Sequence, residues 1–535
     1  MKYKIIGALA FLGLLILLPA WLREKPAVEK ATAPAEGEDT IIILTPHAES
    51  IKHEFERGFQ RYYREKFQRN ITIDWRSPGG TSDIVRYIND RYEASFRRYC
   101  EERNLPWNAQ LAAAFRNYRV KPDKNAPVGT EGHIRQLFLD SDVSIDIDLF
   151  FGGGTYDHSN QARKGYAVDA GLQQSHPEWF KKEVMPEKWS GESIYDPKGG
   201  YYGVCLSTFG ICYNIDRQKE IGPAPKKWHD LAAPGYFNKL AVADPTKSGS
   251  INKCFEVLIQ QCMAEAVAAG RTPGEGWQDG MNLIRRLVGN ARSITESAGR
   301  VTREVASGNA AAGMAIDFYA LSEAQFVEFQ TQGKSRRIEY VPPEGGSSVS
   351  ADPVQLLRGA PNRKQAVAFI EFLLSETGQQ LWQYRAGTPG GPEKYTLRRP
   401  CVRRDLYSGK HREFMADADY NPYTATTDFE YNPAWTGRYF SLIRVLIRTT
   451  MLDAADELRG AWQAIIAAGG EKAVPQAAAE FDKAVVSYEE AAQAAAGLSV
   501  SATNPMKEVI KLRRSWTMRS MEHYRKAQKL AEAGK

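Results

Sequence analysis

The feature that most constrains the fold is a strand-then-helix order that repeats from residue 40 onward. The run TIIIL (residues 40–44) is short, apolar and β-branched, as buried strands are, and apolar residues at helical spacing follow it as far as Phe67. A second, alternating run, NITIDW (70–75), turns at SPGG and leads into TSDIVRYI (81–88), where Thr81 or Ser82 is expected to cap a helix. This order predicts a parallel sheet with right-handed helical crossovers.

The alternation of expected strands and helices is interrupted and then begins again, which predicts an α/β protein with two lobes. A mixed helical and Pro-containing stretch precedes a buried strand at 145–154, and a new βα series follows the extended segment KGGYYGVCLSTFGICYN (198–214). We expect a first lobe over residues 40–200 with an insertion at 90–140, a second lobe over 201–335, a return to the first lobe over 336–439, and a helical module over 440–535. The helical module is expected to pack on the second half of the chain, with a dedicated partner-binding surface as the alternative.

The N-terminus has the pattern of an export signal. Lys2 and Lys4 precede an uncharged, mostly apolar run over residues 5–22, so residues 1–25 are expected to be a signal peptide or a transmembrane anchor. The only small-x-small cleavage pattern, at 31–33, is distant from that run, which slightly favours an anchor in contact with the membrane. Residues 26–39 are rich in Ala, Pro and Glu and are expected to be a flexible linker. The remainder is then expected outside the cytoplasm, in the periplasm of a double-membraned cell.

Composition and missing motifs exclude several functions. A net charge of +6 over 535 residues is mild, and acidic and basic residues are interleaved, so nucleic acid is not an expected partner. Six cysteines are too few for a disulfide scaffold, and their spacing makes a zinc site unexpected. Neither G-x-S-x-G nor H-E-x-x-H occurs, and DPTKSGS (244–250) lacks the glycine spacing of a nucleotide loop. Hydrolase chemistry and nucleotide hydrolysis therefore have no motif to support them.

Four strand ends carry small hydroxyl residues just before a helix, at 45–46, 81–82, 246–250 and 295–297. Helix N-termini expose free backbone N–H groups and a partial positive charge, and such turns gather at the carboxyl edge of parallel strands, where ligands bind. Two lobes that face each other with these turns would suit an anion or a metal–anion complex. The alternative for each turn alone is a helix cap.

Several side chains near these turns could contact a metal or a polar ligand. They are His47, Glu49, Asp244, Glu296, Asp317 and Tyr319. A ferric ion prefers carboxylate and phenolate oxygens and accepts imidazole. For a single histidine at a helix start, however, a surface or capping contact is the more common role.

The chain resembles a known family through a set of motifs between Thr40 and Tyr407, outside the insertion. They are ILTPHAESIKHEFERGF, PGGTSDIVRYI, DLFFGGGTYDH, YYGVCLSTFGICYN, ADPTKSGS, GMAIDFYA, PPEGGSSVSADPVQLL and FIEFLLSETGQQLW. These are similar to the extracytoplasmic solute-binding proteins of ABC importers, within the type 2 periplasmic binding proteins and their ferric-iron and phosphorylated-solute subgroup. The resemblance implies two α/β lobes with a cleft between them, plus a C-terminal helical extension peculiar to this chain.

The same resemblance implies a binding protein and not an enzyme, together with a set of ligand contacts. The protein would capture ferric iron or a small, perhaps phosphorylated, organic anion and deliver it to an ABC permease with its ATPase subunit, with no cofactor except a ferric ion as cargo. The implied ligand-binding residues are Thr45, His47, Gly80, Thr81, Ser82, Thr246, Ser248, Asp317 and Tyr319. Only if the ligand is ferric would His47 and Tyr319 bind metal.

Ferric members commonly carry adjacent tyrosines where this chain has Asp317-Phe318-Tyr319, so an organic anion remains an alternative to iron. The competing function is a membrane-tethered ligand sensor or scaffold that uses the same fold.

Overall fold

The computed structural model of the chain describes residues 38–333, 336–424, 429–500 and 504–534. The expected signal peptide or anchor and most of the expected linker lie outside these ranges. Within these ranges, no helix combines the length and the apolar character needed to cross a bilayer.

The first lobe is built on the parallel strands that the sequence pattern predicts. Strands β1 (Glu38–Leu44), β2 (Asn70–Arg76) and β3 (Leu149–Phe151) are parallel, with β1 between the other two. Strand β12 (Val349–Leu357) pairs antiparallel with β3, with the short β4 (Ala167–Val168) and with the first half of β7 (Tyr202–Asn214). The predicted parallel strands at the N-terminus are therefore present, and β12 and the first half of β7 extend the sheet through antiparallel pairs.

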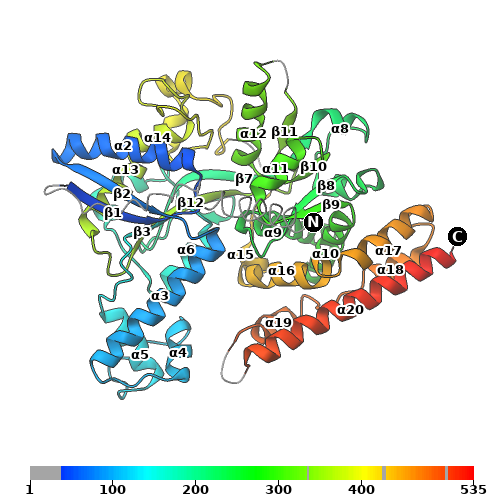
Figure 1. Cartoon of the computed structure of the whole chain (residues 1–535), viewed down its shortest axis with the longest axis horizontal. Helices are drawn as coiled ribbons and strands as arrows, with labels where there is room; N and C mark the ends of the chain where they lie inside the picture. Colours follow the sequence, from blue (N-terminus) through cyan, green and yellow to red (C-terminus); the bar gives the residue numbers. More distant parts are fainter. Residues whose placement is uncertain (1–37, 334–335, 425–428, 501–503, 535) are drawn as a thin grey trace, which may run out of the picture.

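Helices cover both faces of this sheet because side chains alternate along the strands. Ile41 and Ile43 pack under α2 (Glu49–Phe67), α13 (Arg363–Leu374) and α14 (Glu376–Gln383). Leu44 packs on the opposite face under α3 (Thr81–Glu102). Helix α3 extends beyond the sheet and forms a projection with α4 (Ala109–Arg116) and α5 (Glu131–Asp140), at the lower left of Figure 1.

The second lobe has its own core around the second half of β7. Strands β10 (Ala312–Ile316) and β11 (Ile338–Val341) pair antiparallel with β7, and β8 (Leu240–Ala243) and β9 (Ala291–Thr295) continue the sheet in parallel. Its helices are α8 (Ile215–Lys219), α9 (Gly249–Ala268), α10 (Pro273–Gly289), α11 (Ala298–Ala306) and α12 (Asp317–Gln330). The predicted two-lobed α/β architecture is thus present, with the two lobes linked by strand pairing through β7.

The C-terminal helices belong to the core of the second lobe. They are α16 (Phe440–Ile447), α17 (Ala455–Ala467), α18 (Pro475–Phe481), α19 (Ala491–Gly497) and α20 (Met506–Ala533), with a π-helical turn at Arg448–Leu452 (Figure 1). The indole of Trp462 donates a 2.8 Å hydrogen bond to Asn290, and Arg285 and Arg286 of α10 bind the carbonyl and carboxylate of Asp482. The helices that follow the lobes are therefore an integral layer of the second lobe.

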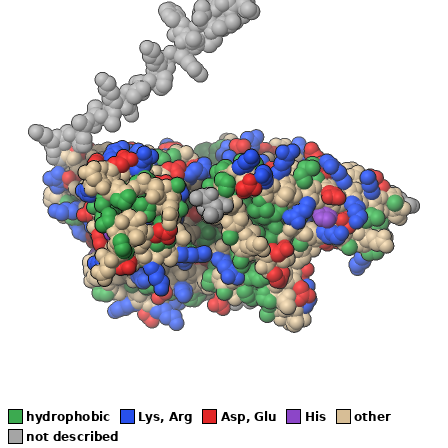
Figure 2. Space-filling view, turned by 90° about the horizontal axis from the view of Figure 1, so that it is seen from below, with side chains coloured by type: hydrophobic (Ala, Val, Ile, Leu, Met, Phe, Trp, Pro, Cys, Tyr) green, Lys and Arg blue, Asp and Glu red, His purple; other side chains and the backbone are tan. Residues whose placement is uncertain are grey.

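Charged side chains of both signs are mixed over the face seen in Figure 2. This distribution agrees with the mild net charge of +6 and gives no single-sign field of the kind that nucleic-acid binding needs.

Within the described ranges, the chain passes between the lobes three times. Strand β7 crosses near Thr208, where its partner changes from β12 to β10, and the chain returns into β12 at Val349. The third passage comprises residues 429–448, called here the bridging segment, which includes α15 (Pro433–Thr436) and α16. Two lobes joined by two adjacent strands can rotate about a hinge, whereas this chain adds a further connection.

Candidate functional site

Three helices begin at one place in the junction between the lobes. A β-carbon at Gly80, which precedes α3, would lie 3.4 Å from the carbonyl oxygen of Lys247 in the second lobe. A β-carbon at Gly249, the first residue of α9, would lie 4.0 Å from Cβ of Thr81. A β-carbon at Gly153, just before α6 (Thr155–Lys164), would lie 2.8 Å from the Thr81 methyl carbon. The structure therefore brings two of the four predicted turns, 81–82 in the first lobe and 246–250 in the second, close together.

The convergence of these helix N-termini makes the junction electropositive. Asp83 and Asp157 offset the dipoles of α3 and α6 in their first turns, but the first turn of α9 carries no acidic residue. Lys247 lies beside the α9 terminus, is exposed, and forms no ion pair with any residue in the described ranges. Arg444 of the bridging segment adds a second positive charge and donates a 3.0 Å hydrogen bond to the Ser82 hydroxyl.

The hydroxyl groups of the turns have different roles. Ser248 caps α9 by accepting from the N–H of Ile251 at 3.4 Å, and Thr246 donates to Asp244 at 2.7 Å. Thr45 is buried and accepts from the N–H of His47. The Thr81 hydroxyl forms no hydrogen bond within the part of the chain that the structure describes.

Helix α3 is capped differently from the sequence prediction. Gly80, and not Thr81 or Ser82, is the cap residue, and the Asp83 carboxylate accepts from the Gly80 N–H at 3.2 Å. The preceding Gly79 has φ 149°, a conformation that side chains disfavour, so the glycine pair determines where the helix begins. The cap prediction was wrong because the helix already includes Thr81 and Ser82 as its first two residues, and the cap position before them is a glycine without a side chain.

His47 is held by a buried carboxylate of the return strand β12. Its Nε2 lies 3.2 Å from Oδ2 of Asp352, its ring packs edge-on against Phe151, and its Nδ1 is buried without a partner in the described ranges. Two other sequence candidates lie apart from this contact: Glu49 is exposed and pairs with Lys52, and Glu296 is exposed. His47 is therefore an interior group of the first lobe and not a surface cap.

Arg399 is a central residue of the site that the sequence analysis did not identify. Its side chain is 1% exposed, and it donates to Asp352 at 2.6 Å and to Ser207 of β7 at 2.8 Å. Its guanidinium lies 4.2 Å from the ring centre of Phe318, which belongs to the second lobe. Arg399 thus connects the His47–Asp352 pair of the first lobe with the 317–319 turn of the second.

The charge balance of this cluster shows in the pKa of Asp352. Burial raises the pKa of this carboxyl group, but Arg399 and then His47 outweigh burial and lower it to about 2.

The short LRRP stretch around Arg399 has no strand or helix pattern, so only the fold could place this residue in the site.

Asp317 is the buried acidic group on the second-lobe side. Its Oδ2 accepts from the Thr208 N–H at 2.8 Å and from the Thr208 hydroxyl at 3.1 Å, and its Oδ1 accepts from the Phe318 N–H. Burial raises the pKa of Asp317 to about 6, against the opposing effect of these hydrogen bonds and of Arg399. Tyr319 is half-buried, and its hydroxyl forms no hydrogen bond among the described residues.

The bridging segment contacts both lobes beside this site. In the first lobe, the Tyr431 N–H donates to the Ser190 carbonyl at 3.0 Å, and Tyr156 of α6 contacts Ser441 at 3.3 Å. In the second lobe, Asn252 donates to the Phe440 carbonyl at 2.9 Å, and the Arg448 guanidinium binds Asp244 at 2.6 Å. A segment that the sequence did not connect with the ligand site therefore spans the junction.

A buried ion-pair cluster lies under the bridging segment. Lys253 of α9 bonds to Glu256 at 2.9 Å and to Glu192 of the first-lobe hairpin, which comprises β5 (Lys188–Trp189) and β6 (Glu192–Ser193). The ring of Tyr431 covers the Lys253 ammonium at 3.6 Å, and its hydroxyl donates to Glu256 at 2.9 Å. Lys253 therefore ties together both lobes and the bridging segment.

Comparison with known proteins points to solute binding. Residues 147–401 match the sequence model of a family described as bacterial extracellular solute-binding protein. The resemblance inferred from the sequence motifs is thereby confirmed over these residues.

One similar protein is the phosphoglycerate transport regulatory protein PgtC of Salmonella typhimurium, 28% identical over 255 residues, which are 47% of this chain and 55% of PgtC. The chain thus spans about half the length of that curated relative. Among solved structures, the apo ferric ion-binding protein A of Pasteurella haemolytica aligns with a TM-score of 0.48 and 11% identity, over 76% of this chain and 96% of the other. The fructose-6-phosphate-bound protein AfuA of Actinobacillus pleuropneumoniae aligns with a TM-score of 0.42 and 16% identity, over 70% and 95%.

Proposed function

With residues 147–401 matching the extracellular solute-binding family, we propose that this chain is the extracytoplasmic binding protein of an ABC importer. It captures a small organic anion, with a phosphorylated one as the first choice, between its two lobes. It then delivers the anion to a membrane permease that is driven by a cytoplasmic ATPase subunit.

The observation that carries the proposal is the meeting of the α3, α6 and α9 N-termini at the junction. The partial positive charges of helix N-termini repel one another when they are brought together. An anion placed among them offsets that repulsion and accepts hydrogen bonds from the free N–H groups of the helices. Thr81, Lys247 and Ser248 surround this position, and Lys247 has no carboxylate partner in the described ranges. These groups favour an oxyanion over a neutral sugar or a cation.

Arg399 argues against ferric iron as the cargo. A ferric ion held by His47 and Tyr319 would have to approach a guanidinium that is fixed 2.6 Å from Asp352, the partner of His47. In a poorly solvated interior, a repulsion between like charges is several times stronger than in water. Phe318 also occupies the position beside Tyr319 where a second phenolate would be needed.

The name of the relative PgtC suggests a ligand class for the test. Phosphoglycerate carries both a phosphate and a carboxylate, and the junction offers more than one positive group, namely the α9 terminus with Lys247 and the guanidinium of Arg399. We therefore expect three-carbon phosphorylated acids to bind more tightly than sugar phosphates or inorganic phosphate.

The experiment is a thermal-shift and calorimetric titration of the full-length chain with 3-phosphoglycerate, fructose 6-phosphate, inorganic phosphate and ferric citrate. A ligand present at 100 times its Kd stabilises the folded state by about 2.7 kcal/mol. Lys247→Met should weaken binding of the anion about tenfold, whereas Lys226→Met, at an exposed lysine of the same lobe, should leave it unchanged. A shift with ferric citrate alone, or equal affinity in the Lys247 and Lys226 variants, would contradict the proposal.

A further inference from the structure

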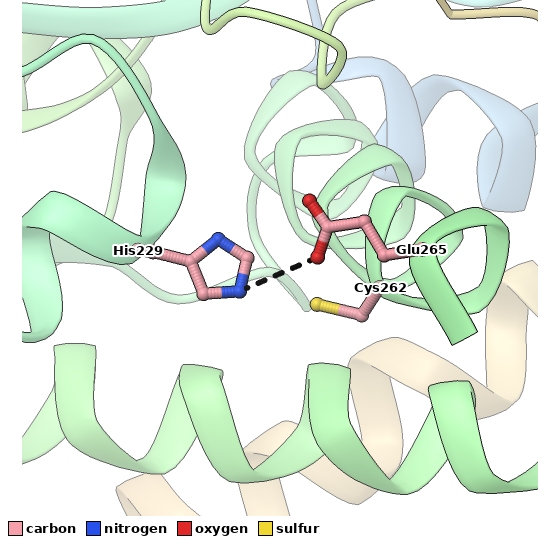
Figure 3. Close-up of side chains that lie close together, drawn as sticks. All are labelled: His229, Cys262 and Glu265. Atoms are coloured by element: carbon pink, nitrogen blue, oxygen red, sulfur yellow. Dashed lines mark ion pairs between the residues drawn. The ribbon is translucent and has the colours of Figure 1, made fainter. Parts of the chain in front are cut away.

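A second cluster of ligating side chains lies in the second lobe, away from the junction. Cys262 and Glu265 lie one turn apart on α9, and His229 lies in the short 3-10 turn Trp228–Ala232. The ligating atoms of the three residues all lie within 4.8 Å of one another, and Nε2 of His229 is 3.7 Å from Oε2 of Glu265. Figure 3 shows the three side chains pointing toward a common position.

These donors are the types that bind zinc. In a tetrahedral site the metal lies about 2.3 Å from a Cys sulfur and about 2.0–2.2 Å from His nitrogen and carboxylate oxygen. Two ligands of one tetrahedral ion are then roughly 3.3–3.8 Å apart, which follows from those bond lengths. Side-chain rotations that move the ligating atoms by about 1 Å or less would complete this arrangement.

Neighbouring groups hold the three side chains in place. The Gln261 amide donates to the other oxygen of Glu265 at 3.1 Å and also to the Glu344 carbonyl, so it orients the carboxylate. Trp228 donates to the Gly346 carbonyl at 2.7 Å and fixes the turn that carries His229. Such outer hydrogen bonds orient metal ligands and strengthen metal binding.

The cluster is open on one side only. The side chains of His229 and Glu265 are 45% and 48% exposed, whereas Cys262 is 2% exposed. A metal would therefore sit between a buried sulfur and solvent, with room for a water molecule as the fourth ligand. The neighbouring cation Arg271 is engaged by Asp279 at 2.6 Å, so it does not leave an uncompensated positive charge at the site.

We propose that His229, Cys262 and Glu265 bind a thiophilic divalent metal ion such as Zn²⁺, with water as the fourth ligand. As the metal–sulfur bond forms, the Cys262 thiol releases its proton to solvent, and neutral His229 coordinates through a ring nitrogen. The site is separate from the proposed anion site, since Cys262 lies 13 positions, about 20 Å of helix rise, beyond Gly249 at the start of α9.

The test is a titration of the full-length chain with Co²⁺, which reports a bound thiolate by an intense sulfur-to-metal charge-transfer band in the near ultraviolet. We expect one Co²⁺ per chain, one proton released per metal at pH 8, and displacement by Zn²⁺. Cys262→Ser should abolish the band, and His229→Gln and Gln261→Met should weaken Co²⁺ binding about tenfold or more. Cys254→Ser removes another buried thiol of α9 and should leave the band unchanged.

Three results would overturn the proposal: no charge-transfer band, a band that persists in Cys262→Ser, or metal binding without proton release. Because His229 and Glu265 are exposed, His229→Gln remains informative even if Cys262→Ser folds poorly. The anion titration of the unsubstituted chain is independent of this outcome, so either proposal can fail alone.

Discussion

Replacing Arg399 with Met would leave the buried carboxylate of Asp352 without its strongest partner. Met keeps most of the aliphatic stem, so packing against Phe318 is largely preserved while both charged hydrogen bonds, to Asp352 and Ser207, are lost. Among the described residues, His47 would remain as the only side-chain partner of Asp352. The substitution therefore tests whether the core of the site depends on charge compensation.

The expected loss follows from two estimates that agree. Removing one member of a buried ion pair typically costs about 3–5 kcal/mol. Separately, the pKa of Asp352 falls from 3.8 to about 2, and at ~1.36 kcal/mol per unit this shift corresponds to about 2 kcal/mol of stability with Arg399 and His47 both in place, which is of the same order. We expect Arg399→Met to lower the free energy of unfolding by about 3 kcal/mol at pH 7.

The assay is urea unfolding between pH 7 and pH 2.5. A depressed carboxyl pKa contributes stability above its unfolded value of 3.8 and loses it as the pH falls toward 2, so the gap between the two proteins should narrow in that range. The double variant Arg399→Met/Asp352→Asn should recover much of the loss at pH 7. A loss below 1 kcal/mol, or a double variant no more stable than the single one, would refute the reasoning.

Three further predictions concern other parts of the site. The pKa of Asp317 is raised from 3.8 to about 6, so the stability that its protonation contributes is full below pH 3.8 and is lost as the pH rises through 6. Asp317→Asn should therefore reduce the dependence of the unfolding free energy on pH between pH 4 and pH 7. Gly191 has φ 75°, and a β-carbon there would lie 2.0 Å from the Tyr431 carbonyl oxygen. Gly191→Ala should therefore lower the free energy of unfolding in urea by more than ~1 kcal/mol. The loss should exceed that of the control Gly270→Ala, where φ is also positive but the space around the glycine is open. Removing the first-lobe contacts of α16 with Arg444→Ala and Tyr156→Phe should enlarge the radius of gyration of the ligand-free chain in X-ray scattering; an unchanged radius would mean that these contacts do not hold the lobes together.

Much of the fold could be predicted because it depends on local patterns. The apolar run at 40–44 and the alternation at 70–75 determine strand identity and face, and the structure places these strands side by side in parallel. The hydroxyl-rich turns could be predicted to meet because parallel strands bring their carboxyl ends to one edge. The roles of the nine candidate ligand residues stay predictions.

The rest depended on contacts between distant segments. Arg399 and Asp352 lie 47 residues apart, and Lys253 and Glu192 pair across the two lobes, so no spacing rule could identify either pair. The expectation against a zinc site rested on cysteine spacing alone, which cannot detect a histidine 33 positions before Cys262 that the turn at Trp228–Ala232 brings alongside it. The π turn at Arg448–Leu452 also escaped the sequence pattern, because the one-residue shift of a single π turn hardly changes the pattern of so apolar a stretch.

The bridging segment alters what governs the lifetime of a bound solute. Two bodies joined along one line of adjacent strands keep a single rotational freedom about that line, and a third attachment displaced from the line removes it. Here the third attachment passes over the Lys253 cluster and reaches Asp244 and Ser82, on opposite sides of the junction. We therefore expect separation of the lobes to require release of these contacts, so that the residence time of a captured solute would depend on residues 429–448, which need not touch the solute at all.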